Sequence, residues 1–339
     1  MTEQGKIPPP GQPKSLFERA EELLGFEGLA PPPVPEGLAE PAAKRVSRKG
    51  PSEPVQRRAP PPAPPVPDVP TATVKPLETL PEPEPAPETI RFTGSPKAID
   101  RARLAEQGLI EPEGKVTALL EEFRIVKRQL LLSARAARNS GARAQRVLVC
   151  SPLPGEGKTF CATNLALAIA AEKDSEVVLV DADFAKPSIL STLGLPGRHG
   201  VALGLMDALT DRAIRVEDCV IATDVPGLFV LPAGNTSPSD SEFLASARTS
   251  EVLDRLTQGA PNRIVVFDSP PALAASPAAE LAKHVGQALV VARADLTGQT
   301  ALEDALTLLS SCPDIKLLLN AAHFSPSGRR FGTYYGYGE

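Results

Sequence analysis

The stretch SPLPGEGKTF has the composition of a loop that binds phosphate. Gly155 and Gly157 allow backbone N–H groups to turn inward around an anion, and Lys158 and Thr159 follow directly. In such a loop the lysine reaches the β- and γ-phosphates of a nucleotide, and the threonine hydroxyl reaches Mg²⁺. Pro152 stands where the usual pattern has its first glycine, so the motif is incomplete. We predict that ATP is bound by the run Pro154, Gly155, Glu156, Gly157, Lys158, Thr159 and Phe160.

Three aspartates follow apolar runs that have the character of buried strands. Asp181 and Asp183 lie in VVLVDADFAKPS, and Asp268 lies in IVVFDSPPAL. Carboxylates at strand ends are unfavourable unless a cation lies there, and Mg²⁺ with a nucleotide is the usual occupant. Any one of them alone is also explained as a cap of the helix that follows its strand. The three together with the phosphate loop predict a Mg²⁺·nucleotide site.

The three tyrosines of the chain all fall within its last six positions, interleaved with glycines: Tyr334, Tyr335 and Tyr337. A tyrosine in a folded protein usually buries its ring and pairs its hydroxyl. Chain ends are where ordered packing is least expected. The placement therefore indicates a role for these side chains outside the core.

Six apolar runs predict the strands that position the candidate residues: 147–150, 177–180, 228–231, 264–267, 288–292 and 316–320. The stretches between them have helical periodicity, and two further helices are predicted before the first strand, over 99–108 and 116–138. Strands that alternate with helices and are apolar along their length indicate a parallel sheet covered on both faces. We therefore predict an α/β fold with a doubly wound, mostly parallel sheet of the P-loop NTPase type, whose ligand lies beyond the carboxyl ends of the strands.

The N-terminal part of the chain differs in composition from the rest. Of the 38 prolines in the whole chain, 23 lie within residues 1–90. Such a stretch buries too little apolar surface to offset the entropy of ordering, so residues 1–97 are predicted to be a disordered proline-rich arm. Within the arm, residues 15–26 have helical periodicity and form either a docking helix or a transient helix without a partner. The arm is followed by the predicted domains, which are N-terminal helices over 98–140, a nucleotide-binding core over 145–325 and a tail over 326–339.

Composition limits the classes of partner. The formal net charge of −5 is mild, and we expect no nucleic-acid partner. Four cysteines without paired spacing indicate reduced thiols in a cytoplasm. The chain start lacks the apolar segment of a signal peptide, and no run approaches the roughly 18 apolar residues of a membrane span. We expect any membrane role to come through a partner.

Several of these motifs together resemble the bacterial tyrosine kinases, the P-loop autokinases of exopolysaccharide and capsule biosynthesis. DADFAKP looks like their second Walker motif, FDSPP like their Walker B strand, and LPAGNTSPSDSEFLAS like the stretch between the two. EEFRIVKR is similar to their Glu-x-x-Arg-x-x-Arg helix. The resemblance covers residues 98–339, and the combination of GLIEP with EEFRIVKRQLL further resembles the cytoplasmic autokinases of exosortase-linked systems.

This resemblance implies an activity and a set of roles. ATP and Mg²⁺ would be used to phosphorylate the tail tyrosines in trans within a ring of subunits. Thr159, Asp183 and Asp268 would hold the metal, and Asp181 would orient or deprotonate the tyrosyl hydroxyl, although Asp181 and Asp183 could exchange these roles. The ring contact would be made by Glu121, Arg124 and Lys127, unless these residues only form ordinary ion pairs on a solvated helix.

The resemblance also implies an activator, the cytoplasmic tail of a separate membrane adaptor that would recruit the chain to the inner face of the inner membrane. Two positions depart from the family pattern. Ala185 replaces an arginine beside Lys186, and Lys127 replaces an arginine whose bidentate fork is thereby lost.

Two other functions remain open at this point. The ATPases that position septa and partition plasmids share the fold and motif order, but they carry a lysine near the start of the loop, which the run from Ser151 to Gly157 lacks. The third possibility is a non-catalytic nucleotide-binding scaffold of a polysaccharide export complex. The intact Lys158 and the aspartates argue against that scaffold.

Overall fold

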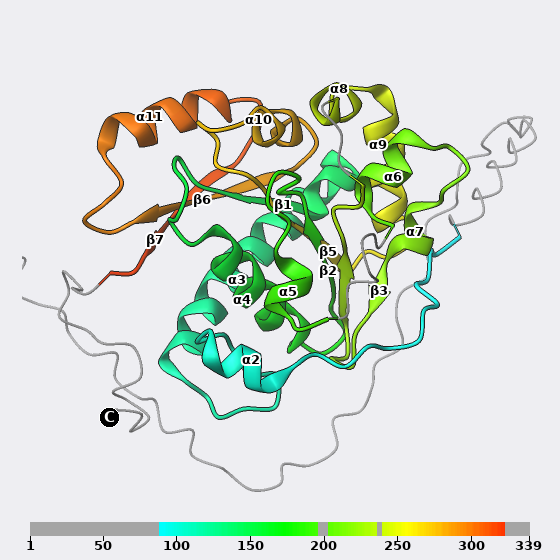
Figure 1. Cartoon of the computed structure of the whole chain (residues 1–339), viewed down its shortest axis with the longest axis horizontal. Helices are drawn as coiled ribbons and strands as arrows, with labels where there is room; N and C mark the ends of the chain where they lie inside the picture. The colour runs from blue at the N-terminus through cyan, green and yellow to red at the C-terminus, as the bar shows by residue number, and fades with distance from the viewer. Residues whose placement is uncertain (1–87, 196–202, 236–238, 323–339) are drawn as a thin grey trace, which may run out of the picture. The chain divides into compact units, whose positions relative to one another are not determined.

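The computed structural model describes residues 88–195, 203–235 and 239–322, and within them the strands form one sheet of order β3-β4-β2-β5-β1-β6-β7 (Figure 1). All neighbouring strands are parallel except β3, which pairs with β4 in the antiparallel sense. The strands are β1 Arg146–Cys150, β2 Glu176–Asp181, β3 Ile221–Ala222, β4 Leu228–Leu231, β5 Arg263–Asp268, β6 Gln287–Arg293 and β7 Ile315–Asn320. The six predicted strands are all present, and β3 escapes prediction because it has only two residues.

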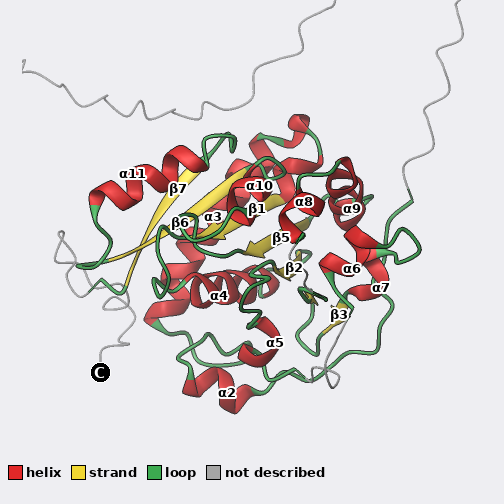
Figure 2. Ribbon diagram, turned by 45° about the horizontal axis from the view of Figure 1, so that its top comes forward, coloured by secondary structure: helices red, strands yellow, loops and turns green. Residues whose placement is uncertain are grey.

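Helices cover both faces of this sheet, so the predicted doubly wound architecture is confirmed (Figures 1 and 2). One face packs against α2 Arg101–Glu106, α3 Ala118–Ala136, α4 Lys158–Ala170 and α5 Ile189–Thr192. The other face packs against α6 Leu205–Thr210, α7 Val216–Cys219, α8 Asp240–Leu244, α9 Ala247–Thr257, α10 Pro277–Ala282 and α11 Gln299–Leu308. Two short 3₁₀ turns, Arg138–Ser140 and Ala142–Gln145, lead from α3 into β1.

Alternation along β1 shows why its residues from Val147 to Cys150 are all apolar. Val147 and Val149 belong to the core on the α4 side, whereas Leu148 and Cys150 belong to the core on the α9 side. Because both faces are covered, every position of β1 is buried, and no polar alternation is possible.

The helical stretch before β5 is divided into α8 and α9 rather than continuous. Ser246 has an extended backbone (φ −77°, ψ 156°), and its hydroxyl donates to the carbonyl oxygen of Phe243 at 2.6 Å. A serine hydroxyl that bonds to a nearby backbone carbonyl oxygen competes with helix continuation.

The predicted end of the disordered arm at residue 97 is wrong, because residues 88–97 pack against the domain. The ring of Phe92 lies edge-on to Phe229 with centroids 4.9 Å apart, and the guanidinium of Arg263 lies 4.2 Å from the centre of the Phe92 ring. The N–H of Lys97 donates to the carbonyl oxygen of Ala222 at 2.9 Å. Phe92, together with backbone hydrogen bonds of Ile90 and Lys97, thus attaches this segment to the domain. The rest of the arm, the predicted helix at 15–26 and the tail at 326–339 lie outside the described residues.

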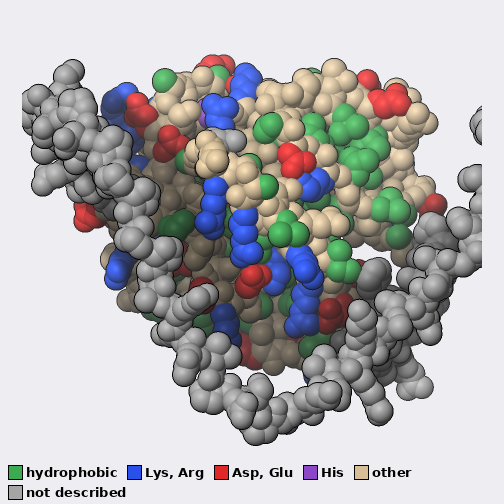
Figure 3. Space-filling model, turned by 180° about the vertical axis from the view of Figure 1, so that it is seen from behind, with side chains coloured by type: hydrophobic (Ala, Val, Ile, Leu, Met, Phe, Trp, Pro, Cys, Tyr) green, Lys and Arg blue, Asp and Glu red, His purple; other side chains and the backbone are tan. Residues whose placement is uncertain are grey.

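The surface opposite to the view of Figure 1 carries a band of Lys and Arg side chains interspersed with acidic ones (Figure 3). None of the helices within the described ranges combines the length and apolar character needed to cross a membrane. The four cysteines are all buried and unpaired.

Candidate active site

The predicted phosphate loop connects β1 to α4, between Cys150 and Lys158. Gly155 and Gly157 have φ values of +79° and +96°, a left-handed backbone that favours glycine. α4 begins at Lys158 directly after Gly157 and continues for 13 residues, so its unsatisfied N–H groups face the loop. The local geometry of an anion-binding loop is therefore present even though Pro152 replaces the first glycine of the motif.

Lys158, Thr159 and Asp268 form a compact group at the carboxyl end of β5. The Thr159 hydroxyl donates to Oδ2 of Asp268 at 2.7 Å, and Lys158 is 8% exposed. Asp181 lies directly opposite Asp268 in the β2–β5 register, and the N–H of Ala182 donates to the carbonyl oxygen of Asp268 at 2.8 Å. The fold therefore brings Thr159 and Asp268, which are 109 positions apart in the chain, into contact.

Burial gives both carboxyl groups unusual acidities. It raises the pKa of Asp268 to about 7, with the nearby Asp181 carboxylate adding to the shift and the Thr159 hydrogen bond and Lys158 opposing it. It raises the pKa of Asp181 to about 6, against the lowering effect of hydrogen bonds from the N–H groups of Ile189 and Ser188. Charge at this position is therefore unfavourable without a cation.

The donor set fits a magnesium ion. Oδ1 of Asp181 and Oδ1 of Asp268 are buried and have no hydrogen-bond partner among the described residues. Those residues contain no cluster of three acidic, His or Cys side chains around one point. Mg²⁺ is commonly held by only one or two carboxylates, with substrate phosphates and water completing its octahedron. The Thr159 hydroxyl and the Asp268 carboxylate, with a second carboxylate from Asp183 or Asp181 at the end of β2, form an oxygen-only set of this kind.

Asp181 and Asp183 occupy different environments although both lie at the end of β2. Oδ2 of Asp181 accepts from the N–H groups of Ser188 at 2.8 Å and Ile189 at 2.9 Å, and its side chain is 2% exposed. Asp183 is partly exposed, and its Oδ1 accepts from the N–H of Lys186 at 3.1 Å. Ala185, at the position where the family pattern has arginine, is exposed.

The structure adds three contacts to the phosphate loop that the motif does not contain. Nδ2 of Asn320 donates to the carbonyl oxygen of Glu156, Arg293 donates to that of Gly155, and the Thr297 hydroxyl donates to the Glu156 carboxylate. Asn320 ends β7, so inspection of every strand end would have found it. Thr297 carries no signal in the sequence.

The predicted ring-contact residues on α3 differ in how they are used within the chain. Arg124 forms an ion pair with Glu121 one turn before it, and it is exposed. Nζ of Lys127 lies 3.1 Å from the carboxylate of Glu172, beyond the end of α4, and its side chain is 14% exposed. Lys127 therefore joins two elements of the same chain. The predicted acceptors Tyr334, Tyr335 and Tyr337 lie outside the described residues.

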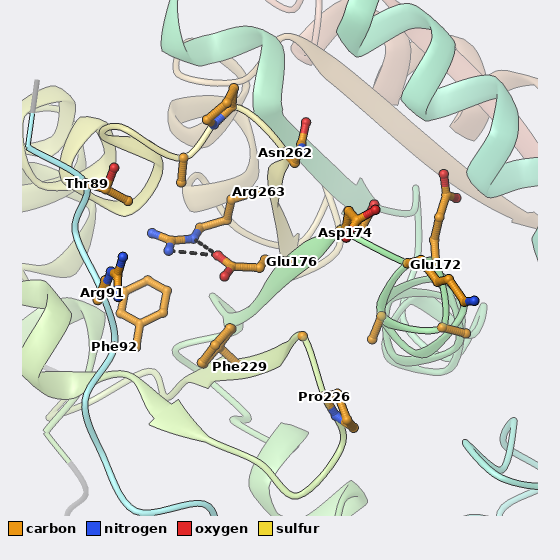
Figure 4. Close-up of a pocket in the computed structure, with 17 residues that line it drawn as sticks. Thr89, Arg91, Phe92, Glu172, Asp174, Glu176, Pro226, Phe229, Asn262 and Arg263 are labelled. Atoms are coloured by element: carbon orange, nitrogen blue, oxygen red, sulfur yellow. Dashed lines mark hydrogen bonds and ion pairs between the residues drawn. The ribbon is translucent and has the colours of Figure 1, made fainter. Parts of the chain in front are cut away.

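A cavity of about 790 Å³ lies at the amino ends of β2, β4 and β5, the edge of the sheet opposite to the phosphate loop. Arg263 and Glu176 point toward one another in its wall, where Nη2 of Arg263 lies 2.8 Å from the Glu176 carboxylate, and Phe92 and Phe229 lie below them (Figure 4). The guanidinium donates to the Glu176 carboxylate and to the carbonyl oxygens of Leu256 and Ile90. Among the described residues, none that lines the cavity has a buried side-chain polar atom without a hydrogen-bond partner.

Comparison with known proteins identifies the family. No family model matches the chain. The chain is 30% identical over 166 residues to the tyrosine-protein kinase YwqD of Bacillus subtilis, covering 49% of this chain and 67% of that protein. The chain belongs to the bacterial tyrosine-protein kinase family. Within this family it is also 25% identical over 223 residues to the putative tyrosine-protein kinase CapB of Staphylococcus aureus, covering 66% of this chain and 92% of CapB.

Other bacterial tyrosine kinases that it resembles are much longer. The chain is 30% identical over 164 residues to the tyrosine-protein kinase Ptk of Acinetobacter johnsonii, but it spans 21% of that protein. It spans 18% of the putative tyrosine-protein kinase EpsB of Ralstonia nicotianae, at 37% identity over 148 residues. The chain thus corresponds to about a fifth of the length of these relatives.

Solved structures show the same fold. The chimerical protein CapA2B2 has a TM-score of 0.52 at 23% identity, covering 66% of this chain and 92% of that one. The BceF tyrosine kinase domain has a TM-score of 0.50 at 24% identity, covering 68% and 93%. At these identities the likeness concerns the fold.

Proposed function

We propose that this chain is an ATP-dependent protein-tyrosine autokinase that phosphorylates its own C-terminal cluster, Tyr334, Tyr335 and Tyr337. The observation that carries the proposal is the group of Lys158, Thr159 and Asp268 at a glycine-turned phosphate loop, in a chain of the bacterial tyrosine kinase family. The tail supplies tyrosines that the described core does not use.

In the proposed reaction the γ-phosphoryl group of ATP passes in line to a tyrosyl oxygen. Catalysis of this kind is mostly positioning and neutralisation of charge. Lys158 and the N–H groups of residues 155–160 would bind the phosphates. Thr159, Asp183 and Asp268 would hold Mg²⁺, which when bound neutralises charge on the phosphates. Asp181, whose pKa is raised to about 6 by burial, would accept the tyrosyl proton, since a phenol of pKa near 10 needs such help at neutral pH.

Assembly forms a second part of the proposal. Transfer would take place in trans within a ring of copies, with Glu121, Arg124 and Lys127 on α3 at the contact between subunits. The fold is shared with the chimerical protein CapA2B2, and CapB is named a putative tyrosine-protein kinase. By analogy with the family resemblance, the cytoplasmic tail of a membrane adaptor would recruit and activate this chain at the inner membrane, where it would regulate exopolysaccharide polymerisation or export.

The experiment is mass spectrometry of the intact protein and its peptides after incubation with ATP and Mg²⁺. We expect mass steps of phosphate that map to the tail and that disappear in Lys158→Met and in a variant with phenylalanine at the three tail positions. An unmodified tail with steady ATP hydrolysis, even with an adaptor peptide present, would contradict the kinase and favour a switch ATPase. Neither reaction would favour the scaffold.

A further inference from the structure

The glycines of the phosphate loop do not by themselves fix its conformation. Glu156 stands between Gly155 and Gly157, which both have left-handed backbones. Glycines on both sides of a residue give the loop many accessible conformations. Ligand binding must then overcome the conformational entropy that is lost when the loop becomes ordered. An anion-binding loop works best when its N–H groups already point at the ligand.

The Glu156 side chain points into the protein rather than toward a ligand. It is 0% exposed, and both carboxylate oxygens are used. Oε2 accepts from the N–H of Leu153 at 2.7 Å, and Oε1 accepts from the hydroxyl of Thr297. That hydroxyl in turn accepts from the N–H of Arg293 at 2.8 Å, so its orientation is fixed by the end of β6.

The carbonyl groups of the loop are held from the same side. Nδ2 of Asn320 donates to the carbonyl oxygen of Glu156 at 2.8 Å, and Nη1 of Arg293 donates to that of Gly155 at 3.3 Å. In a planar trans peptide the carbonyl oxygen and the next N–H point in opposite directions. Holding these two oxygens toward β6 and β7 therefore turns the N–H groups of Glu156 and Gly157 the other way.

The left-handed backbone of Gly157 favours glycine at this position, and the contact with Asn320 adds to that requirement. A Cβ on Gly157 would lie 2.2 Å from Nδ2 of Asn320, in addition to the strain of its φ of +96°. Asn320 is itself fixed, because it pairs with Arg293 in the β6–β7 register and its carbonyl oxygen accepts from the N–H of Ala294 at 2.9 Å. The contact therefore joins the end of β7 to the phosphate loop.

We propose that Thr297 and Asn320 are positioning residues that hold the phosphate loop in its nucleotide-binding conformation, acting through the carboxylate and the carbonyl oxygen of Glu156. The inference rests on the proposed nucleotide site and extends it to the segments after β6 and β7. Neither residue touches the nucleotide in this proposal. They keep the N–H groups of the loop pointing toward the phosphate site before the nucleotide binds.

The test is the affinity of the full chain for ADP with Mg²⁺, measured by isothermal titration calorimetry. Asn320→Ala loses its hydrogen bond to the loop, and Thr297→Val loses its bonds to both Glu156 and the N–H of Arg293. Each substitution is expected to weaken binding roughly three- to tenfold. Thr297→Ser keeps the hydroxyl and should restore the affinity to within about twofold of the unaltered protein. Thr307→Val is the matched control, because the Thr307 hydroxyl donates only within α11, on its exposed side, to the carbonyl oxygen of Glu303.

The outcomes separate the two proposals. Variants that keep their melting temperature and bind ADP as tightly as the unaltered protein would overturn the positioning role. The role is also overturned if Thr297→Ser binds as weakly as Thr297→Val, because the hydroxyl would then not be what matters. If the unaltered protein itself binds no ADP, the nucleotide site fails, and the inference that rests on it fails too.

Discussion

At the scale of single residues, Asp268 is held where its charge is unfavourable. It is fully buried at the end of β5, and Asp181 lies opposite it in the neighbouring strand. Oδ1 of each carboxyl group has no hydrogen-bond partner among the described residues. Buried carboxyl groups lower the stability of the fold, and they are typical of functional sites where a ligand offsets that cost. The burial of Asp181 and Asp268 therefore supports a cation site.

The raised pKa of Asp268 predicts how stability depends on pH. Between its ordinary value and about 7 the folded protein holds a proton that the unfolded chain has lost, so this residue makes the ligand-free protein less stable as pH rises through that range. Asp268→Asn removes the effect, and we expect it to raise the free energy of unfolding by about 1–3 kcal/mol at pH 8 and by much less at pH 5. Urea titrations at both pH values measure it. Asp304→Asn, at an exposed position of α11, is the control, and an equal pH dependence in both variants would contradict the prediction.

Asp181 and Asp183 can be distinguished by kinetics. If Asp181 accepts the proton, Asp181→Asn should lower kcat for tail phosphorylation by about 10²–10⁴-fold, with ADP affinity nearly unchanged. Asp183→Asn should instead raise the Mg²⁺ concentration needed for half-maximal rate, because it removes a metal ligand. Initial rates over a range of Mg²⁺ concentrations measure both. The reverse pattern would mean that the two aspartates exchange roles.

At the scale of elements, the sequence predicts most of the fold because apolar runs and periodicity are local signals. The strand ends that carry Asp181 and Asp268 follow from those runs alone, and so does the loop before Lys158. What escapes prediction depends on distant contacts. Phe92 becomes an anchor only because Phe229 and Arg263 lie beside it, and Thr297 reaches Glu156 only because β6 lies next to β1.

The packing of residues 88–97 is open to a direct test. Phe92→Ala removes the ring that contacts Phe229 and Arg263, and we expect it to release the segment and lower the free energy of unfolding by roughly 1–3 kcal/mol. Hydrogen exchange and limited proteolysis should show increased access at this segment while the sheet stays protected. Thr93→Ala, at an exposed neighbouring position, is the control. Unchanged exchange in Phe92→Ala would contradict the anchoring role.

Helix α3 offers a second test, because Arg124 forms its ion pair within the helix, whereas Lys127 forms one with Glu172 outside it. Arg124 is exposed and pairs within its own helix, so Arg124→Ala should change the free energy of unfolding by less than about 0.5 kcal/mol while lowering the oligomeric mass. Lys127 is mostly buried against Glu172, and Lys127→Ala should also destabilise the monomer, by about 1 kcal/mol. Light scattering and urea unfolding measure the two effects. An oligomeric mass that Arg124→Ala leaves unchanged would contradict the contact.

Across the whole chain, the residues that we propose to carry out the reaction lie at one edge of the sheet. The phosphate loop, the carboxylates and the end of β7 share this edge, and Asn320 contacts the loop only a few residues before the tail begins. The 14 residues from Asn320 to Tyr334 span at most about 50 Å when extended. That length reaches the chain's own site or a neighbour's, so reach alone does not decide between transfer in cis and in trans.

A mixing experiment tests whether one copy phosphorylates the tail of another. Lys158→Met keeps the tail but loses the phosphate-binding lysine, whereas the variant with phenylalanine at Tyr334, Tyr335 and Tyr337 keeps the site but loses the acceptors. The two proteins, which differ in mass, are incubated with ATP and Mg²⁺ separately and together, with an adaptor peptide present, and their tail peptides are analysed by mass spectrometry. We predict phosphate on the tail of Lys158→Met in the mixture only. A tail that stays unmodified in the mixture, under conditions in which the unaltered protein is phosphorylated, would contradict transfer in trans, and an unaltered protein that is never phosphorylated would contradict the kinase itself.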